Sequence, residues 1–247
     1  MSKLTKIIIA VAALVVLAAL VGPKVVANLR DDEDLEAELP DLPTTVDSET
    51  STANDPSTGE SSTSNAANES DASGTWTAVS GDRDTYFVGY QIEETLRGED
   101  ITATGTTGQY RGSLTIADET IVELELTVDM TTLESDEGRR DDSIRTDGLE
   151  TNEFPEASFT VTEPVALPNT PEIGTPLSVD VVGDLTLHGV TRSITVTVEA
   201  RWNGDTVDVT GEIPITLADY SIEAPSQPFV SVREEGKVVF VVQFARA

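Results

Sequence analysis

The sequence predicts an all-β fold for residues 74–247, with eight or more antiparallel strands that form a sandwich or a barrel. Two observations support this prediction. Apolar and polar residues alternate with a period of two in several runs, as they do in strands with one dry face and one wet face. Segments with helical periodicity are few, and turn residues separate the runs. Closure into a barrel would also remove the exposed edges of an open sheet.

The clearest alternation lies in Ile121–Met130, where Val122, Leu124, Leu126, Val128 and Met130 are expected to share one face. Two more strands, 177–187 and 194–200, are predicted on either side of a hairpin loop over His188–Thr191. In that loop Gly189 is free to adopt a positive φ angle. The remaining runs predict strands over Tyr86–Ile92, Gly112–Ile116, Ala157–Thr162, Thr206–Leu217 and Lys237–Phe244.

One stretch, Glu134–Thr151, breaks this pattern because it is rich in charged residues and has few apolar ones. It predicts a single short surface helix over residues 139–146 that ends near Gly148. Phe154 and Pro155 then return the chain to an extended conformation.

The first 30 residues have a different character from the rest. They hold Lys3, Lys6, Lys24 and Arg30 but no acidic residue, around an apolar run that begins at Ile7. A cleavable signal peptide and a retained membrane anchor both fit this pattern. The apolar stretch from 7 to 27 reaches the roughly 20 residues that a spanning helix needs, which favours an anchor over cleavage before Asn28. In either case the basic start stays inside and the remainder crosses the membrane.

Residues 31–73 form a second segment, with thirteen Asp and Glu residues, fourteen Ser and Thr residues and no Lys or Arg. Such a composition buries too little apolar surface to offset the loss of conformational entropy on folding. We therefore expect a disordered, self-repelling acidic linker.

The composition excludes several classes of function. The chain has 45 acidic residues against 15 basic ones, a formal charge of -30, so nucleic acid is not an expected partner. It has no Cys and one His, which removes thiolate sites and most zinc sites, and no cofactor or metal is expected. His188 is expected to be a polar turn residue. A catalytic triad at His188 would need a Ser and an acid brought to it by the fold, and the abundance of both in the chain gives no support for one. The protein is therefore not expected to be an enzyme.

Four groups of residues closely resemble the YceI-like family in order, spacing and strand context. They are Arg140-Asp141-x-x-Ile144-Arg145-Thr146, Leu149-Glu150-Thr151, Phe154-Pro155-x-Ala157-x-Phe159 and Gly183-Asp184-Leu185-Thr186-Leu187-His188-Gly189-Val190-Thr191. The resemblance implies a lipocalin-like antiparallel barrel of about eight strands whose apolar interior takes up a polyisoprenoid chain. Tyr86–Glu94 and Gly112–Ile116 look like an opening found in membrane-anchored members. The family's commoner opening has a His after the first strand, which this chain lacks.

The resemblance thus implies a lipid-binding or lipid-carrying module outside the cytoplasm, with an isoprenoid or similar amphiphile as its partner. Alternation alone fits a solid core equally well, and the alternative function is a filled barrel that acts in envelope interactions or stress protection. Homodimerisation stays open. The residues expected to line the ligand site are Tyr90, Leu114, Leu124, Leu126, Val128, Phe159, Val161, Leu185, Leu187, Val196 and Phe240.

Arg140 and Arg145 are added to this set because basic residues are scarce in the chain and both lie in a segment that matches the family. Two roles are open to them. One is a structural ion pair with Asp141 or a neighbouring acid. The other is contact with the polar head of a ligand at the mouth of the barrel, since Arg binds phosphate in a bidentate manner.

Overall fold

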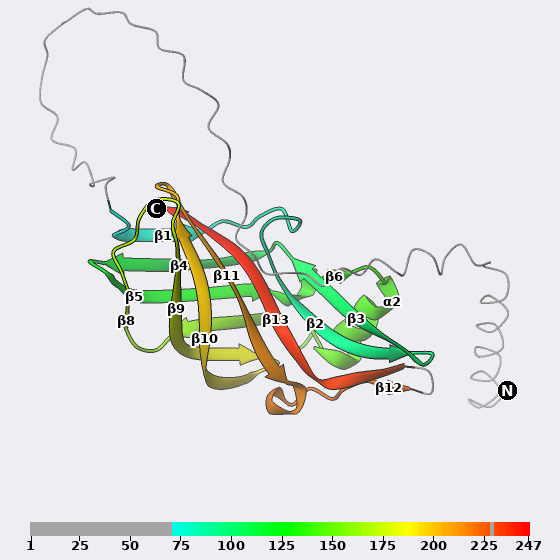
Figure 1. The fold of residues 1–247 in the computed structure, drawn as a ribbon. Coiled ribbons are helices and arrows are strands. Elements are labelled where there is room, and N and C mark those ends of the chain that lie inside the picture. Colours follow the sequence, from blue (N-terminus) through cyan, green and yellow to red (C-terminus); the bar gives the residue numbers. More distant parts are fainter. Residues whose placement is uncertain (1–70, 228–229) are drawn as a thin grey trace, which may run out of the picture. The chain divides into compact units, whose positions relative to one another are not determined.

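The computed structural model describes residues 71–227 and 230–247 (Figure 1). The predicted signal or anchor of residues 1–30 lies outside these residues, and so does nearly all of the predicted linker. Within the described ranges, no helix has both the length and the apolar character needed to cross a membrane.

Antiparallel strands make up most of the described chain, as predicted. They are β1 (Gly74–Ala78), β2 (Phe87–Leu96), β3 (Glu99–Thr107), β4 (Tyr110–Ala117), β5 (Thr120–Asp129), β6 (Glu134–Ser135), β7 (Glu156–Val161), β8 (Val165–Ala166), β9 (Pro176–Leu187), β10 (Val190–Trp202), β11 (Thr206–Thr216), β12 (Ser226–Gln227) and β13 (Val230–Arg246). The alternating runs gave the approximate positions of eight of them, whereas β1, β3 and the two-residue strands β6, β8 and β12 were not predicted.

Eight of the strands in the described part of the chain close into a ring in the order β1-β4-β5-β7-β9-β10-β11-β13, because β13 also pairs with β1. The 17-residue β13 makes this closure possible. Its C-terminal end pairs with β1, with Trp76 opposite Arg246, while its N-terminal part pairs with β2 along the same edge. The β2–β3 hairpin therefore leaves the ring as a flap, and β6 pairs with β3. The antiparallel barrel is confirmed.

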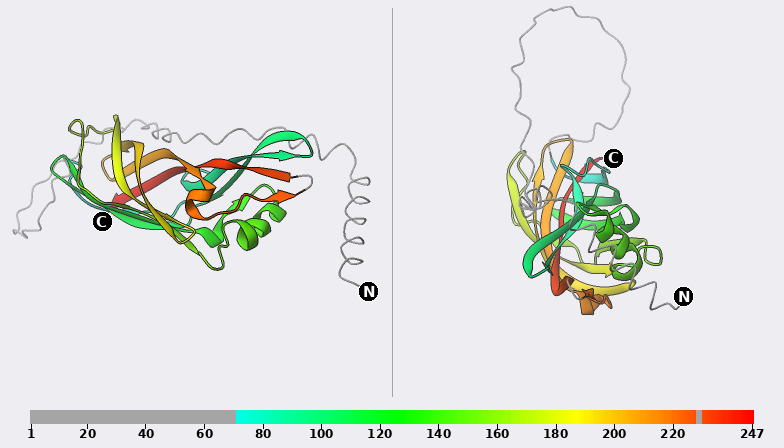
Figure 2. Two further views of the ribbon diagram at one scale, coloured as in Figure 1. Left: turned by 90° about the horizontal axis from the view of Figure 1, so that it is seen from below. Right: turned by 90° about the vertical axis from the view of Figure 1, so that its right-hand side faces the viewer.

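Short helical segments lie between the strands: η1 (Met130–Thr132), α2 (Gly138–Ser143), η2 (Ile144–Gly148) and η3 (Leu217–Tyr220). The α2 helix starts where the Glu137 side chain accepts a hydrogen bond from the Arg139 amide, and it runs directly into the π-helical turn η2. The predicted short helix and its end near Gly148 are therefore confirmed. Figure 2 shows the strands curling around one another, with the green α2 helix at one side of them.

The predicted hairpin after β9 is tighter than expected. Only His188 and Gly189 separate β9 from β10, and both have positive φ angles, 51° and 72°. Positive φ at both central residues is the signature of a type I′ turn, whose twist matches that of the flanking strands.

One predicted side-chain orientation is wrong. Val122 is 43% exposed, whereas its neighbour Ile121 is buried. The cause is a register shift in the β4–β5 ladder, where Thr115 pairs with Glu123 but Ile116 pairs with Ile121. Val122 is left as the extra residue of this bulge and points outward, so the alternation of β5 restarts beyond it.

The buried apolar residues form two main clusters rather than one. The first cluster is built around Trp76, Leu114, Trp202 and Phe244, and the second lies along β9, β10 and β11 and extends to η3. Five residues pack against both clusters, and all of them are only partly buried: Met130, Val165, Val209, Val238 and Phe240. The two buried clusters therefore meet across side chains that solvent still reaches.

Candidate functional site

The inner face of the barrel brings together the apolar residues that the sequence placed there. Leu114, Leu124, Leu126 and Val128 belong to or pack against the first cluster. A second set belongs to or packs against the second cluster: Phe159, Val161, Leu185, Leu187 and Val196. Phe240 packs against both clusters. Whether these side chains contact a ligand stays a prediction.

Several of these inner side chains are not fully buried. Leu124, Leu126, Phe159, Val161 and Phe240 all retain intermediate exposure, although their strands turn them towards the two clusters. Residues in a solid core are close-packed and leave few voids larger than a water molecule. Partial exposure of side chains on the inner face is expected where the strands opposite do not pack against them.

Two inner phenylalanine rings lie flat against glycines of neighbouring strands. A Cβ atom on Gly183 would stand 2.5 Å from Cζ of Phe159, and one on Gly211 would stand 2.7 Å from Cζ of Phe240. Such contacts are far below van der Waals distance, so only glycine allows the rings to lie there. The rings consequently run along the barrel wall and do not project across the interior.

Tyr90 repeats this arrangement on the flap. It stands opposite Gly105 in the β2–β3 ladder, and a Cβ on that glycine would lie 2.4 Å from Cε1 of the ring. The Tyr90 hydroxyl oxygen is buried and has no hydrogen-bond partner among the described residues. Burial is the largest cause of a raised pKa for this hydroxyl; Arg140 acts to lower the pKa, while Asp141 and Glu94 raise it further. Tyr90 therefore keeps its proton and remains a hydrogen-bond donor.

Arg140 joins the α2 helix to the flap. Its guanidinium lies 3.0 Å from a carboxylate oxygen of Glu94 in β2 and also pairs with Asp136. The side chains of Arg140 and Glu94 are only 15% and 10% exposed. Burial acts to lower the pKa of Arg140, but the hydrogen bonds and charges of Glu94 and Asp136 outweigh it, so the pKa is raised. In this structure Arg140 forms the structural ion pair that was one of its two predicted roles.

Arg145 has a looser environment at the other end of the helical segment. Its guanidinium lies 3.4 Å from Asp142 and donates to the backbone carbonyl of Leu133 at 3.4 Å. The side chain is 34% exposed. The two arginines therefore bind α2 and η2 to different neighbours, and a ligand contact by either of them stays a prediction.

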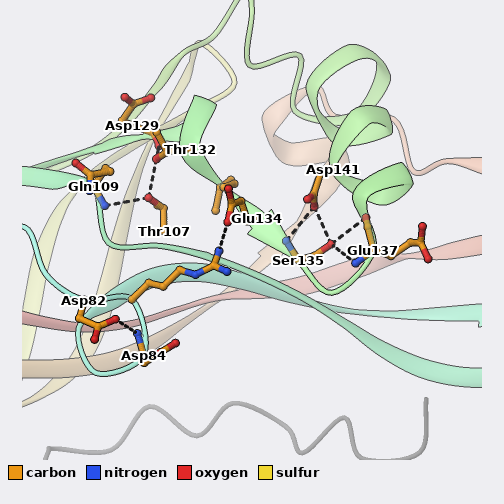
Figure 3. A network of polar contacts seen from close by, with 12 residues as sticks. Asp82, Asp84, Thr107, Gln109, Asp129, Thr132, Glu134, Ser135, Glu137 and Asp141 are labelled. Carbon is orange, nitrogen blue, oxygen red and sulfur yellow. Dashed lines mark hydrogen bonds and ion pairs between the residues drawn. The ribbon is translucent and has the colours of Figure 1, made fainter. Parts of the chain in front are cut away.

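A polar network holds the start of α2 in place (Figure 3). Asp141 accepts hydrogen bonds from the backbone amide and the hydroxyl of Ser135 in β6, at 2.9 and 2.7 Å. The neighbouring Glu134 forms an ion pair with Arg83 at 2.7 Å. Since β6 pairs with β3, these contacts fix the helix relative to the flap that carries Tyr90 and Glu94.

His188 makes contacts beyond the C-terminal end of the helical segment. Its Nε2 lies 2.9 Å from a carboxylate oxygen of Glu150, and its Nδ1 lies 3.1 Å from the carbonyl oxygen of Tyr220. The Phe154 ring packs on the imidazole with ring centroids 4.3 Å apart. These contacts tie the β9–β10 turn to η3 and to the loop after η2, a structural role for a turn residue. Among the described residues, no group of three or more His, Asp or Glu side chains is arranged to hold a metal ion.

A family model described as a YceI-like domain matches residues 76–244, which include parts of all eight strands of the ring. The chain belongs to the YceI-like family. The resemblance to the family is thereby confirmed, whereas the likeness to its membrane-anchored members stays a prediction. A UPF0312 protein of Vibrio parahaemolyticus is 36% identical over 102 residues, which cover 38% of this chain and 50% of that protein. Protein YceI of Shigella flexneri is 31% identical over 112 residues, covering 42% of this chain and 53% of that protein.

This YceI-like chain spans about half the length of the curated relatives that it matches. Among solved structures, a polyisoprenoid binding domain from Saccharophagus degradans aligns with a TM-score of 0.54 at 19% identity. The alignment covers 70% of this chain and 98% of that domain. At such low identity the likeness supports the fold alone, and it agrees with the closed antiparallel barrel described above.

Proposed function

We propose that this YceI-like barrel binds an isoprenoid or a similar amphiphilic lipid in its interior, between the two apolar clusters, and carries it without chemical change. The proposal rests on how the side chains of the inner face are arranged. Apolar side chains there keep partial exposure, and Phe159 and Phe240 lie along the wall over glycines. An eight-stranded barrel is wide enough to hold one small ligand when side chains leave its centre free.

The energetics of such a site favour a long apolar chain. Each Å² of apolar surface that leaves water contributes about 25 cal/mol, and the inner wall offers Leu, Val, Ile and Phe side chains along its length. An isoprenoid chain would cover the exposed parts of Leu124, Leu126 and Phe240 at the same time as it buries its own surface. The domain from Saccharophagus degradans, whose fold is similar, is described as binding a polyisoprenoid.

We further propose that the barrel works outside the cytoplasm and stays attached to the membrane through residues 1–30. Their apolar run is long enough to span a bilayer, and the basic residues before it favour a cytoplasmic start. An acidic linker of about 40 residues would let the barrel move over the surface, and the tether would raise its local concentration at the lipid source.

Lipid binding is tested on the full chain produced in a host that makes polyprenyl lipids. We expect native mass spectrometry to show an added mass that organic solvent releases and that matches a prenyl chain. The variant Gly211→Ala should hold about tenfold less lipid, because its Cβ would push the Phe240 ring off the wall and into the interior. The matched control is Gly138→Ala, where a Cβ meets no atom within 4 Å.

A clean mass without lipid, together with identical behaviour of both variants, would overturn lipid binding. The search would then turn to the filled-barrel alternative and to proteins captured by the acidic outer surface, which salt should release.

A further inference from the structure

Tyr90 carries an unsatisfied hydrogen-bond donor on an otherwise apolar face of the flap, which continues the face of β13 that holds Val238 and Phe240. Val88, Tyr90 and Ile92 alternate along β2 and face the same side, and they stand opposite Phe240, Val238 and Gly236 of β13. Buried hydroxyl groups in folded proteins normally have a partner, because an unpaired one loses its bonds to water. The buried Tyr90 hydroxyl oxygen has none among the described residues.

The ring is held so that the hydroxyl has a fixed position. It lies across Gly105, where a Cβ would come within 2.8 Å of the hydroxyl oxygen. Glu94 follows on the same face of β2, and its ion pair with Arg140 places α2 beyond the tyrosine. The hydroxyl therefore stands between the apolar wall and a charged group of residues contributed by the flap and the helix.

This charged group is poorly suited to a phosphate. The side chains that act electrostatically on Tyr90 are Arg140, Asp141, Glu94 and Asp136, three carboxylates against one guanidinium. The guanidinium already binds two of these carboxylates. Among the described residues, Arg140 is the cation that acts on Tyr90, so a phosphate placed there would meet an excess of negative charge.

We propose that the Tyr90 hydroxyl donates a hydrogen bond to an uncharged oxygen, a hydroxyl or a carbonyl, at the end of the bound isoprenoid, and that the carboxylates around Arg140 disfavour phosphorylated ends. This inference rests on the proposed lipid binding. It names Tyr90 as the residue that selects the end group, while the apolar wall binds the chain.

The experiment compares three probes that share one branched carbon skeleton: geranylgeraniol, geranylgeranyl diphosphate and the oxygen-free hydrocarbon phytane. The full chain is equilibrated with equal amounts of the three, unbound probe is removed, and the bound probes are extracted and quantified by mass spectrometry. The wild type should hold mostly geranylgeraniol. Tyr90→Phe removes only the hydroxyl oxygen, and it should lower the ratio of bound alcohol to bound hydrocarbon about tenfold, the value of one hydrogen bond.

A second variant tests the charge argument separately. Asp136→Asn removes one carboxylate from an exposed position and leaves the Glu94–Arg140 pair in place. It should raise the share of bound diphosphate several-fold without changing the ratio of alcohol to hydrocarbon. Thermal unfolding of both variants verifies that the barrel is intact.

Two results would overturn the inference. If the probes bind but Tyr90→Phe leaves the ratio of alcohol to hydrocarbon unchanged, the end-group role of Tyr90 is wrong and lipid binding stands. If none of the three probes binds, the inference and the proposed function fall together.

Discussion

At the scale of single residues, Tyr86 shows how the fold controls a proton outside the proposed lipid site. Its hydroxyl contacts Asp208, which is 2% exposed, at 3.2 Å and accepts a hydrogen bond from Gln243 at 2.6 Å. Burial, followed by the charge of Asp208 and the hydrogen bond to it, raises the pKa of Tyr86 from 10.0 to about 12. The folded chain thus holds this proton more tightly than the unfolded chain does.

The consequence is a loss of stability at high pH. Below about pH 10 the phenol is protonated in both states; between about 10 and 12 the unfolded chain loses the proton first, so the free energy of unfolding falls as pH rises. Tyr86→Phe should make this decrease shallower. Urea unfolding of both proteins at pH values of about 9 and about 11.5 measures it. Parallel pH profiles would show that Tyr86 ionises alike in both states.

Residue-scale predictions from the sequence succeeded where a side chain's neighbours were implied by alternation. Leu124, Leu126 and Val128 fell on the inner face because period-two patterning places them there. The same rule applied to Val88, Tyr90 and Ile92 would also have put Glu94 inside. Its partner was not predictable, because Arg140 lies 46 residues further along the chain and only the fold brings the two together.

At the scale of elements, the Glu94–Arg140 pair is the main ion pair between the helical segment and the flap. Both side chains are largely removed from solvent, so removing one of them leaves the other charged and poorly solvated. Arg140→Ala should therefore lower the free energy of unfolding by about 2 kcal/mol. Urea unfolding measures this, and the exposed pair Lys237–Glu212 supplies a control, since Lys237→Ala should cost less than about 1 kcal/mol.

The pairing itself is isolated by adding Glu94→Ala to Arg140→Ala. Because the double variant removes both buried members of the pair and leaves only the more exposed Asp136 without its partner, its loss should be smaller than the sum of the two single losses. Additive losses would mean that the helix and the flap are held together by their other contacts, such as Asp141 with Ser135.

The β3 strand escaped sequence prediction for a physical reason. In β3 the residues that face Ile92, Tyr90 and Val88 are Ala103, Gly105 and Thr107, which are too small or too polar to produce a visible apolar alternation. Small residues are needed there because the Tyr90 ring occupies the space over Gly105. The small residues that keep β3 from showing an apolar alternation are thus the residues that make room for the Tyr90 ring.

At the scale of the whole molecule, the chain separates its charges strongly along the sequence. The first 30 residues carry only basic charges, residues 31–73 carry only acidic ones, and residues 74–247 hold 32 acidic residues against 11 basic ones. The closed barrel could be predicted because alternation, turn residues and family motifs all agreed. The full length of β13 could not be predicted, because the segment Arg233–Gly236 near its N-terminal end is charged and irregular. This length lets one strand pair with both β1 and β2.

This separation of charge leads to a prediction about topology. If residues 1–30 are a retained anchor, intact cells should expose the linker and the barrel, because basic residues before an apolar span stay in the cytoplasm. A broad-specificity protease added outside should cut the linker and release a barrel fragment, detected by mass spectrometry. Trypsin provides the comparison: residues 31–73 contain no Lys or Arg, so trypsin should cut after Arg30 instead and release a larger fragment in which the whole linker is still attached to the barrel. In a cell with a single membrane, protection of the linker would place the barrel inside, and barrel found in the medium before any protease would show that the N-terminal segment is cleaved.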